Sequence, residues 1–344
     1  MSVGRRLAYE SGITIPIEDS SQIGEARRAA GNVASDAGLS EVEAGKFAII
    51  VAEAATNISK HATRGEIALR YAGYDARSVE VVALDKGPGI RDLDQAFRDG
   101  YSTAGSSGTG LGAMSRLATA FDVFTMPELG TVVAARVDGS RTGGGVRKAM
   151  FDVGVVRAAK RGESACGDDW SLAVDDERGR GVLTVADGLG HGMSAAEASR
   201  RAVEVGTEHA AEPPGHIVAE LHRALRSTRG AAVAVAEFAA DSPTLRFAGL
   251  GNISAAIVVQ GESKNLVSHN GIAGHEMRKI QEFSYNWPLG AMLVMHSDGV
   301  SARWDLNRYP GLVLRCASVV AGVIYRDFSR GRDDALVVVV RRVT

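Results

Sequence analysis

Residues 182–199 read VLTVADGLGHGMSAAEAS, and they decide how the second half of the chain is interpreted. The apolar run Val182–Ala186 predicts a buried strand, and Asp187 stands where that strand ends. Glycines follow at every second position over Gly188–Gly192, and Ser194–Glu197 then predicts a capping box that opens an alanine-rich helix. Cation and phosphate sites are built in this way, from an acidic strand end and glycines that precede a helix. An ordinary strand-turn-helix gives the same pattern, so this stretch alone leaves both interpretations open.

The same arrangement recurs at three other places in the second half of the chain. Leu293–Gly299 (LVMHSDG) is an apolar run that ends in an acid, whereas Gly331–Val340 (GRDDALVVVV) and Ala165–Val174 (ACGDDWSLAV) place an acidic pair before an apolar strand. Carboxylates from four strand ends that converge in one domain suit Mg²⁺ or Mn²⁺ better than zinc. Two such ions about 3.5–4 Å apart can activate a water molecule for attack on phosphorus. Turn-forming and helix-capping aspartates are the plainer explanation of the same residues.

In the order GDD, ADGLGHG, SDG and DDALVVVV, these motifs resemble those of the SpoIIE-type phosphatases, the bacterial branch of the metal-dependent 2C serine/threonine phosphatases. ACGDDW together with ADGLGHG is most similar to the RsbX type, which serves partner-switching modules. The resemblance spans residues 151–343 and implies a sandwich of two sheets with helices outside. It also implies a set of metal ligands: the side chains of Asp168, Asp187, Asp298 and Asp333 and the carbonyl group of Gly188.

The resemblance gives each of these ligands a role. Asp187 would be the central catalytic carboxylate that bridges two metal ions. Asp298 and Asp333 would complete the second ion, and Asp168 would hold the first ion through water. In each acidic pair the first acid is preferred. His191 is expected to line the entrance of the site or to be a turn residue.

The composition is that of a soluble globular protein with two domains. The chain has 344 residues, of which 45% are hydrophobic and 23% are charged, and its formal net charge is −2. Such a charge gives no global basic field, so neither nucleic acid nor an anionic membrane is an expected partner. Two cysteines provide no disulfide framework and the start of the chain has no apolar signal core, so the cytoplasm is the expected location.

The first half of the chain carries a predicted helix with polar residues on one face. Within FAIIVAEAATNISKHA, Glu53, Asn57, Lys60 and His61 follow one another at a spacing that places them on the same side of the helix. An asparagine can bind Mg²⁺ through its carbonyl oxygen, and a glutamate one turn away can act as a general base. The solvated face of an amphipathic helix gives the same spacing.

Two glycine-rich turns follow in the first half. The predicted strand Val79–Leu84 ends in DKGPGI, where Asp85 is placed to accept a hydrogen bond from an amino group of a base. Gly87 and Gly89 would admit the base ring without a side-chain clash. The run Gly108–Gly112 (GTGLG) then opens a helix, and the free N–H groups at a helix start bind phosphates. A flexible loop has the same composition, so this run alone is weak evidence.

Taken in order, E-x-x-x-N, D-x-G-x-G and GTGLG resemble the motifs of the GHKL ATPases, and no histidine-bearing dimerisation helix precedes Glu53. ISKHA, DKGPGIRDLDQAF and SSGTGLGAMSRL are most similar to the small serine kinases of partner-switching systems, the RsbT type. By this resemblance, Glu53 is the catalytic base, Asn57 a magnesium ligand and Asp85 the adenine contact. The phosphates of ATP would be contacted by Lys60 or His61 and by the glycine-rich turn, which comprises Gly108, Thr109, Gly110, Leu111 and Gly112.

The expected fold is α/β in both halves. Residues 1–138 are predicted to form a GHKL ATPase two-layer α/β sandwich, with helices on one face of a mixed sheet and an edge strand at Ile13–Ile17. Ser40 and Glu43 predict a capping box for the helix that follows. Residues 139–148 form a glycine-rich linker, and residues 149–344 form a 2C-type phosphatase αββα sandwich. Residues 261–287 are weakly patterned and are expected to be an irregular loop or flap.

Together the resemblances imply a bifunctional regulator of bacterial stress or sigma-factor signalling. It would use ATP and Mg²⁺ or Mn²⁺ to phosphorylate and to dephosphorylate a serine or threonine of a STAS-domain anti-sigma antagonist. Two alternatives remain: the first domain senses ATP for the phosphatase, or it is a binding module that sequesters a partner. The presence of Glu53 favours phosphoryl transfer over sensing, because a pure sensor needs no base.

Overall fold

The computed structural model describes residues 5–8, 12–62, 64–72, 77–98, 110–139 and 150–343. Gly108 and Thr109 of the predicted phosphate turn lie outside the described residues, as does the predicted linker after Gly139. The chain divides into two compact units. The N-terminal unit comprises residues 12–147 and 309–326, and the C-terminal unit comprises residues 1–11, 148–308 and 327–344. Residues 309–326 therefore group with the first half of the sequence.

The N-terminal unit contains a five-stranded sheet in the order β2-β3-β4-β6-β5, in which every described strand pair is antiparallel. The expectation of a mixed sheet was wrong, because β3 and β4 and likewise β5 and β6 are joined as consecutive antiparallel neighbours. The predicted edge strand is confirmed as β2. The strands are β2 (Ile13–Ile17), β3 (Gly65–Ala72), β4 (Ser78–Asp85), β5 (Ala120–Met126) and β6 (Gly130–Asp138).

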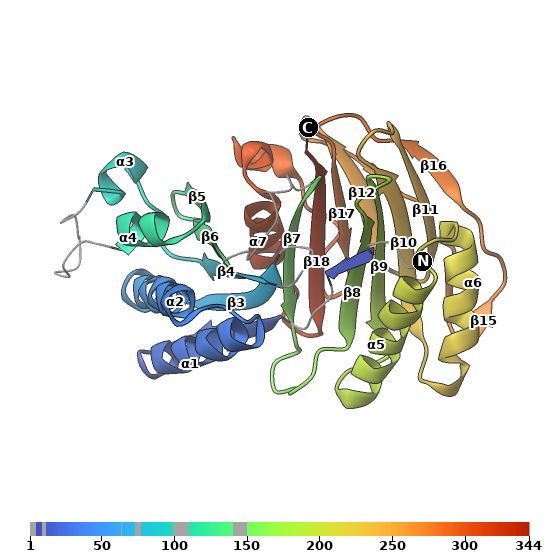
Figure 1. Ribbon diagram of the computed structural model, residues 1–344, viewed down its shortest axis with the longest axis horizontal. Helices are drawn as coiled ribbons and strands as arrows, with labels where there is room; N and C mark the ends of the chain where they lie inside the picture. Colours follow the sequence, from blue (N-terminus) through green and yellow to red (C-terminus); the bar gives the residue numbers. More distant parts are fainter. Residues whose placement is uncertain are drawn as a thin grey trace. The chain divides into compact units, whose positions relative to one another are not determined.

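Helices α1 (Ser21–Asp36) and α2 (Glu41–His61) cover one face of this sheet (Figure 1). Alternate strand residues such as Ile67 and Val81 point to that face and join its buried core, where Phe47 of α2 is fully buried. The predicted capping box is confirmed: Glu43 N–H donates to Ser40 Oγ, and Ser40 N–H donates to the Glu43 carboxylate. Two short helices complete this part of the unit, α3 (Leu93–Ala96) and α4 (Gly110–Leu117).

The opposite face of the same sheet is covered by helix α7 (Ala317–Phe328), which comes from the last tenth of the chain (Figure 1). Residues Ala317 to Arg326 of this helix are all buried. At its centre Gly322 leaves no room for a side chain, because a Cβ there would lie 2.7 Å from Val132 of β6. The unit therefore has three layers: two helices, a sheet, and α7.

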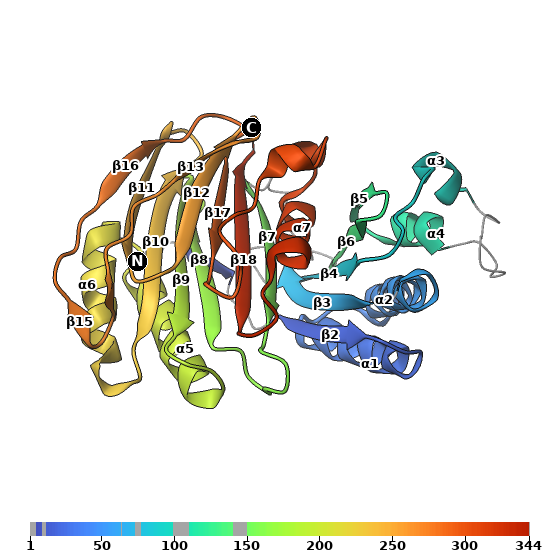
Figure 2. The ribbon, with the colours of Figure 1, turned by 180° about the vertical axis from the view of Figure 1, so that it is seen from behind.

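The C-terminal unit is built on two antiparallel sheets (Figure 2). One has the order β1-β8-β9-β10-β11-β16 and the other the order β13-β12-β17-β18-β7. The strands of the first sheet are β1 (Arg5–Ala8), β8 (Asp168–Asp175), β9 (Arg180–Gly188), β10 (Ala231–Ala239), β11 (Thr244–Leu250) and β16 (Phe283–Asn286). Those of the second sheet are β7 (Phe151–Ala158), β12 (Ser254–Val259), β13 (Glu262–Asn265), β17 (Met292–His296) and β18 (Ala335–Arg342).

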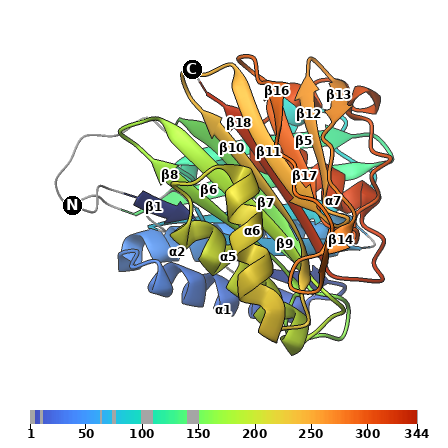
Figure 3. The same cartoon turned by 90° about the vertical axis from the view of Figure 1, so that its right-hand side faces the viewer.

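Helices α5 (Met193–Glu208) and α6 (Pro214–Ala224) pack on the outer face of the six-stranded sheet (Figure 3). Short elements fill the connections: β14 (Gly271–Ile272), β15 (Glu276–Met277), and single 3-10 turns at Leu225–Ser227, Leu306–Arg308 and Leu312–Leu314. Trp287 is fully buried, as expected for a core tryptophan. Among the described residues, no helix is long and apolar enough to cross a membrane.

Two local expectations were wrong in this unit. The predicted Ser194 capping box is absent, because α5 begins at Met193 and its N-cap is Gly192, whose φ of 76° is in the left-handed region that favours glycine. The segment 261–287 is less irregular than expected, since it contributes four short strands. One of them, β16, pairs with β11 at the edge of the six-stranded sheet, with Phe283 opposite Phe247.

Candidate functional site

An acidic cluster lies where the two sheets of the C-terminal unit bring their strand ends together. Asp168 begins β8 and Asp187 lies next to the end of β9, and the antiparallel register places the two residues opposite each other. In the second sheet, Asp298 follows β17 and the pair Asp333 and Asp334 precedes β18. Because β17 and β18 are antiparallel neighbours, the end of one lies beside the start of the other. The topology thus gathers acids from four separate segments.

The ionisation of the cluster shows how closely these carboxyl groups face one another. Burial raises the pKa of Asp187 to about 7, helped by the negative charges of Asp298, Asp333 and Asp334. Burial and the charge of Asp187 raise the pKa of Asp168 well above its usual range. The pKa of Asp298 is also raised, first by burial and then by Asp333. All four predicted carboxylates therefore interact electrostatically, directly or through a shared neighbour.

The two acids of the Asp168–Asp169 pair point to different surroundings, as expected for successive residues of a strand. Asp168 is 1% exposed and faces the cluster. Asp169 is also near Arg157, but the other charges that act on it are Arg200 and Glu204 of α5. The alternation of the strand thus gives the first acid of the pair to the cluster.

Three neighbouring side chains hold the acids in place, and the sequence analysis did not identify them as part of the site. Ser297 Oγ donates to Asp168 Oδ2 at 2.6 Å and itself accepts from the N–H of Leu336 at 3.0 Å. Arg157 Nε donates to the backbone carbonyl of Asp168 at 2.6 Å. Asn252 Nδ2 donates to Asp298 Oδ2 at 2.7 Å. Ser297 stands directly before Asp298, and Arg157 is a charge inside an apolar strand, so both gave a weak signal.

Asp334 is the second acid of the Asp333–Asp334 pair, in which the sequence analysis preferred the first. It is 4% exposed, and its Oδ1 accepts from the N–H of Lys160 at 2.8 Å. Its Oδ2 is buried and has no hydrogen-bond partner among the described residues. A buried carboxylate oxygen with no donor is costly unless a cation neutralises it. A cluster of oxygen donors with raised pKa values and one orphaned oxygen fits hard divalent cations such as Mg²⁺ or Mn²⁺.

Two further residues of the ADGLGHG motif can be placed. Gly188 must be a glycine, because a Cβ there would lie 2.1 Å from the carbonyl oxygen of Ala195 in α5. His191 is outside the acidic cluster: its ring is exposed, and Nδ1 lies 2.7 Å from a carboxylate oxygen of Glu163. The turn histidine is thus held by a hydrogen bond at the surface.

In the N-terminal unit, the predicted helix face and the glycine-rich turn meet. Glu53 and Asn57 lie one turn apart on α2, and both are partly exposed. Gly110, the first residue of α4, is so close that a Cβ there would lie 3.1 Å from Asn57 Nδ2. Leu111 and Gly112 are buried within α4. The start of α4 therefore faces the polar side of α2, where a phosphate group would be expected.

Asp85 ends β4 in the turn that the sequence assigned to the base. Its Oδ1 accepts from the N–H of Gly87 at 2.7 Å, and burial raises the pKa of its carboxyl group. Gly89 has a φ of 73°, and a Cβ there would lie 2.4 Å from the carbonyl oxygen of Met126. Close packing therefore accounts for this glycine, and likewise for Gly87, where a Cβ would lie 2.9 Å from the carbonyl oxygen of His61.

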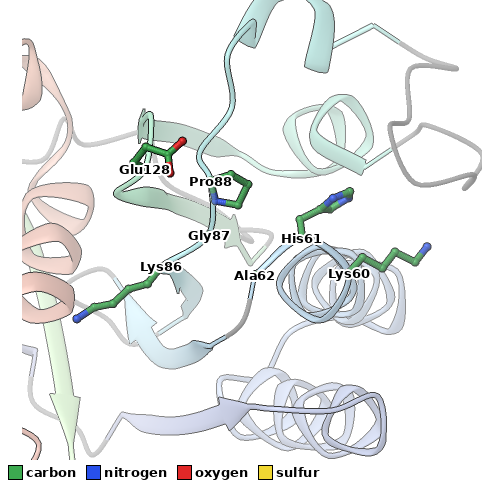
Figure 4. Close-up of a pocket in the computed structure, with 7 residues that line it drawn as sticks. All are labelled: Lys60, His61, Ala62, Lys86, Gly87, Pro88 and Glu128. Atoms are coloured by element: carbon green, nitrogen blue, oxygen red, sulfur yellow. The ribbon is translucent and has the colours of Figure 1, made fainter.

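A cavity of about 420 Å³ borders this turn, lined by Lys60, His61, Ala62, Lys86, Gly87, Pro88 and Glu128 (Figure 4). In the close-up, the ammonium groups of Lys60 and Lys86 point to opposite sides. The charge of His61 acts on Asp85, so this histidine lies toward the Asp85 turn, whereas Asn57 meets the start of α4. The phosphate contact of Lys60 or His61 stays a prediction.

Comparisons with known proteins find a separate match for each half of the chain. Residues 17–137 match the model of the histidine kinase-like ATPase domain. The chain is 32% identical over 111 residues to the serine/threonine-protein kinase RsbT of Bacillus subtilis, an alignment that covers 32% of this chain and 84% of that protein. The chain belongs to the RsbT family of serine/threonine kinases. Its first domain is accordingly an RsbT-type kinase domain with the GHKL fold.

The second domain belongs with the phosphatases. Residues 177–343 match the model of the stage II sporulation protein E (SpoIIE) domain. One similar structure comes from work on the bacterial stressosome, a modular system adapted to control secondary messenger signaling. It is 27% identical with a TM-score of 0.52, and the match covers 56% of this chain and all of that one. A structure of RsbX in complex with magnesium is 20% identical with a TM-score of 0.50, over 57% of this chain and 98% of that one. The chain thus joins an RsbT-type kinase domain to a SpoIIE-type protein serine/threonine phosphatase domain with the 2C fold.

Proposed function

We propose that this protein both phosphorylates and dephosphorylates a serine or threonine of one partner protein, with a separate site for each reaction. The observation that carries the proposal is that, among the described residues, each unit brings together its own set of predicted groups. One unit gathers a buried acidic cluster around Asp187, and the other places Glu53 and Asn57 against the start of α4, with Asp85 in a glycine turn. Neither set needs a residue of the other.

For dephosphorylation, we assign Asp187 to two divalent cations, with Asp298, Asp333 and the carbonyl group of Gly188 as further ligands. Asp168 would hold one cation through water, since one of its oxygens is already hydrogen-bonded to Ser297. Asp334 is close enough to contribute its negative charge. When bound, Mg²⁺ or Mn²⁺ would lower the pKa of water and neutralise the phosphate oxygens. The chain's own contribution is to keep these carboxylates close together in a buried, rigid place.

For phosphorylation, we assign Glu53 as the general base. It would accept the proton of the partner's hydroxyl group while the hydroxyl oxygen forms a bond to the γ-phosphorus of ATP and the bond to the β-phosphate breaks, which releases ADP. Asn57 would bind Mg²⁺, and the N–H groups over residues 108–112 would hold the phosphates. Asp85 would accept a hydrogen bond from the amino group of adenine. Positioning and charge neutralisation supply most of the catalysis in such transfers.

The partner that fits this pair of activities is a STAS-domain anti-sigma antagonist, taken in the unphosphorylated form by the kinase site and in the phosphorylated form by the phosphatase site. This step rests on the kinship with RsbT and SpoIIE-type proteins. A chain that carries both activities would act as a switch in partner-switching regulation, and the supply of ATP would set the phosphorylated fraction of the partner.

The test is a pair of variants in the full chain, assayed with radiolabelled ATP and the candidate partner. Glu53→Ala should abolish phosphorylation and leave phosphatase turnover within about twofold, because the two sites lie in separate units and share no residue. Asp187→Ala should do the reverse, so that phosphorylated partner accumulates instead of rising and decaying. Glu41→Ala, an exposed acid on the same helix as Glu53, is the matched control and should change neither rate.

The sensor alternative gives a different result in the same assay. If the wild type never transfers phosphate, while ATP still changes its phosphatase rate and Glu53→Ala removes that response, the first domain is a sensor. The proposal of two activities is then rejected.

A further inference from the structure

Helix α7 lies in the part of the sequence that matches the SpoIIE phosphatase domain, yet it is a layer of the N-terminal unit. The chain leaves the C-terminal unit after Arg308 and returns to it at Asp327. The segment in between packs on the sheet whose strand β4 ends in Asp85. We propose that Arg326, near the end of this helix, is a positioning residue of the nucleotide site, which holds Asp85 in place for adenine. This rests on the proposed binding of ATP at Asp85.

The segment is fixed to the sheet at its start. The side chain of Asp122 on β5 accepts from Arg315 Nη1 at 3.2 Å and from the N–H of Cys316 at 2.7 Å. The ring of Tyr309 packs edge to face on Phe124, with ring centroids 6.4 Å apart. Contacts of this kind fix the register of a helix on a sheet.

Its middle is fixed by a buried polar network. Arg70 and Glu80 form an ion pair at 2.6 Å across the neighbouring strands β3 and β4. Ser318 of α7 donates to Glu80 Oε2 at 2.8 Å and accepts from Arg70 at 3.3 Å. Both charged residues are at most 9% exposed. Removing one partner of such a network leaves an unpaired buried charge, so the network specifies where α7 lies.

The end of α7 reaches the nucleotide turn. Arg326 is 5% exposed, and its Nη1 lies 3.5 Å from the backbone carbonyl oxygen of Asp85, to which it donates. The adjacent Tyr325 is hydrogen-bonded to the carboxylate of Glu66 on β3. The positive charge of Arg326 also acts on the Asp85 carboxyl group and lowers its pKa. Arg326 therefore acts on both the backbone and the charge of Asp85.

The remaining contacts of Asp85 define what Arg326 adds. The N–H groups of Gly87 and Thr131 bind its carboxylate, and His61 approaches it from α2. Against these, burial raises the pKa of the carboxyl group and so favours its neutral form. An adenine amino group needs an acceptor, and the ionised carboxylate is the better one. Arg326 adds a permanent positive charge that favours the ionised form beyond these two hydrogen bonds, which a histidine does only when protonated.

The experiment is calorimetric titration of the full chain with ATP and with GTP, each with Mg²⁺. GTP serves as the probe of base recognition because guanine carries an acceptor where adenine carries the amino group. We expect Arg326→Gln to weaken ATP binding about tenfold and to reduce the preference for ATP over GTP. Arg326→Lys, which keeps the charge, should retain most of the ATP affinity and most of the preference for ATP over GTP. The matched control is Arg315→Gln, which removes an arginine–carboxylate contact at the other end of the same segment and should leave the preference unchanged.

A pH series separates positioning from packing. Loss of the Arg326 charge raises the pKa of Asp85 further, so the pH below which ATP binding falls should be higher in Arg326→Gln than in the wild type and in Arg326→Lys. Equal losses in Arg326→Gln and Arg315→Gln, with no change in base preference or pH profile, would show that α7 acts only as packing. Asp85→Asn tests the underlying assignment separately. If Asp85→Asn binds ATP like the wild type, the adenine assignment fails and this inference falls with it; if only the Arg326 variants behave like the wild type, the inference alone is rejected.

Discussion

Asp168 and Asp187 stand directly opposite each other on the neighbouring antiparallel strands β8 and β9. Burial raises the pKa of both carboxyl groups. The charge of Asp187 raises the pKa of Asp168 further, and the charges of Asp298, Asp333 and Asp334 raise that of Asp187. The fold keeps an arrangement that lowers its own stability, which is the mark of a site whose geometry is retained for binding.

The first prediction concerns stability in the absence of divalent metal. The folded pKa of Asp187 is about 7, above its unfolded value, so between about pH 4 and pH 7 the folded state binds more protons than the unfolded state. The free energy of unfolding should therefore fall as pH rises through this range, by at most about 1.4 kcal/mol per pH unit for this group. Asp187→Asn should flatten the slope. Urea denaturation in chelator at pH 5 and pH 7.5 measures it, and a slope that Asp187→Asn leaves unchanged would contradict the prediction.

A second prediction concerns metal. Hydrolysis of a phosphoester by the full chain should require Mn²⁺ or Mg²⁺, because water must lose a proton to attack. The same ions should raise the melting temperature more at pH 7.5 than at pH 5, since protons compete for the carboxylates. The activity should vanish in excess chelator and return when Mn²⁺ is added back. Full turnover in chelator would rule out the proposed role of the acidic cluster.

A third prediction concerns Ser297, whose hydroxyl group donates to Asp168 and thereby favours its ionised form. Ser297→Ala should raise the pKa of Asp168 and weaken metal binding about tenfold. The metal-free protein should also lose some stability, because the buried N–H of Leu336 loses its acceptor. Titration with Mn²⁺, followed by calorimetry, tests this. Ser199→Ala is the control, because that buried serine on α5 donates only to the carbonyl group of Ala196 in the described contacts. An equal loss of Mn²⁺ affinity in both variants would mean that Ser297 has no specific role.

A fourth prediction concerns the packing of α7. Gly322→Ala should destabilise the protein by about 1–3 kcal/mol, because the new Cβ would press against Val132 and Leu84. Gly45→Ala on α2, where nothing lies within 4 Å of the added Cβ, should instead stabilise it by about 0.5–1 kcal/mol. Thermal or urea unfolding of both variants gives the comparison, and a neutral Gly322→Ala would show that α7 is loosely seated.

Much of the candidate site could be read from the sequence because its motifs are local. An aspartate at the end of an apolar run and glycines before a helix are recognisable within a few residues, and this was enough to find Asp187, Asp298, Asp85 and the α2 face. The Ser194 cap failed for a local reason too, since the left-handed Gly192 is the N-cap and the helix starts two residues earlier than predicted.

The residues that the sequence analysis missed act across long separations. Ser297 lies 129 positions from Asp168, and Lys160 lies 174 positions from Asp334. No local pattern encodes such a pair, because antiparallel pairing and the packing of sheets bring them together only after folding. Strand β1, Arg5–Ala8, is a similar case, since its place beside β8 is set by pairing alone.

By itself, then, the sequence determined most of the element types, the two families of motifs and the acids Asp168, Asp187, Asp298 and Asp333, because hydrophobic period and short turns are properties of neighbouring residues. Tertiary structure alone decided which oxygens face one another, which acid of the first pair joins the cluster, and where α7 belongs. Helix α7 has the apolar pattern of any buried helix. This pattern predicts that the helix is buried, but it does not indicate which sheet the helix packs against. Only the partners of Ser318, Gly322 and Arg326 place it on the sheet that ends in Asp85.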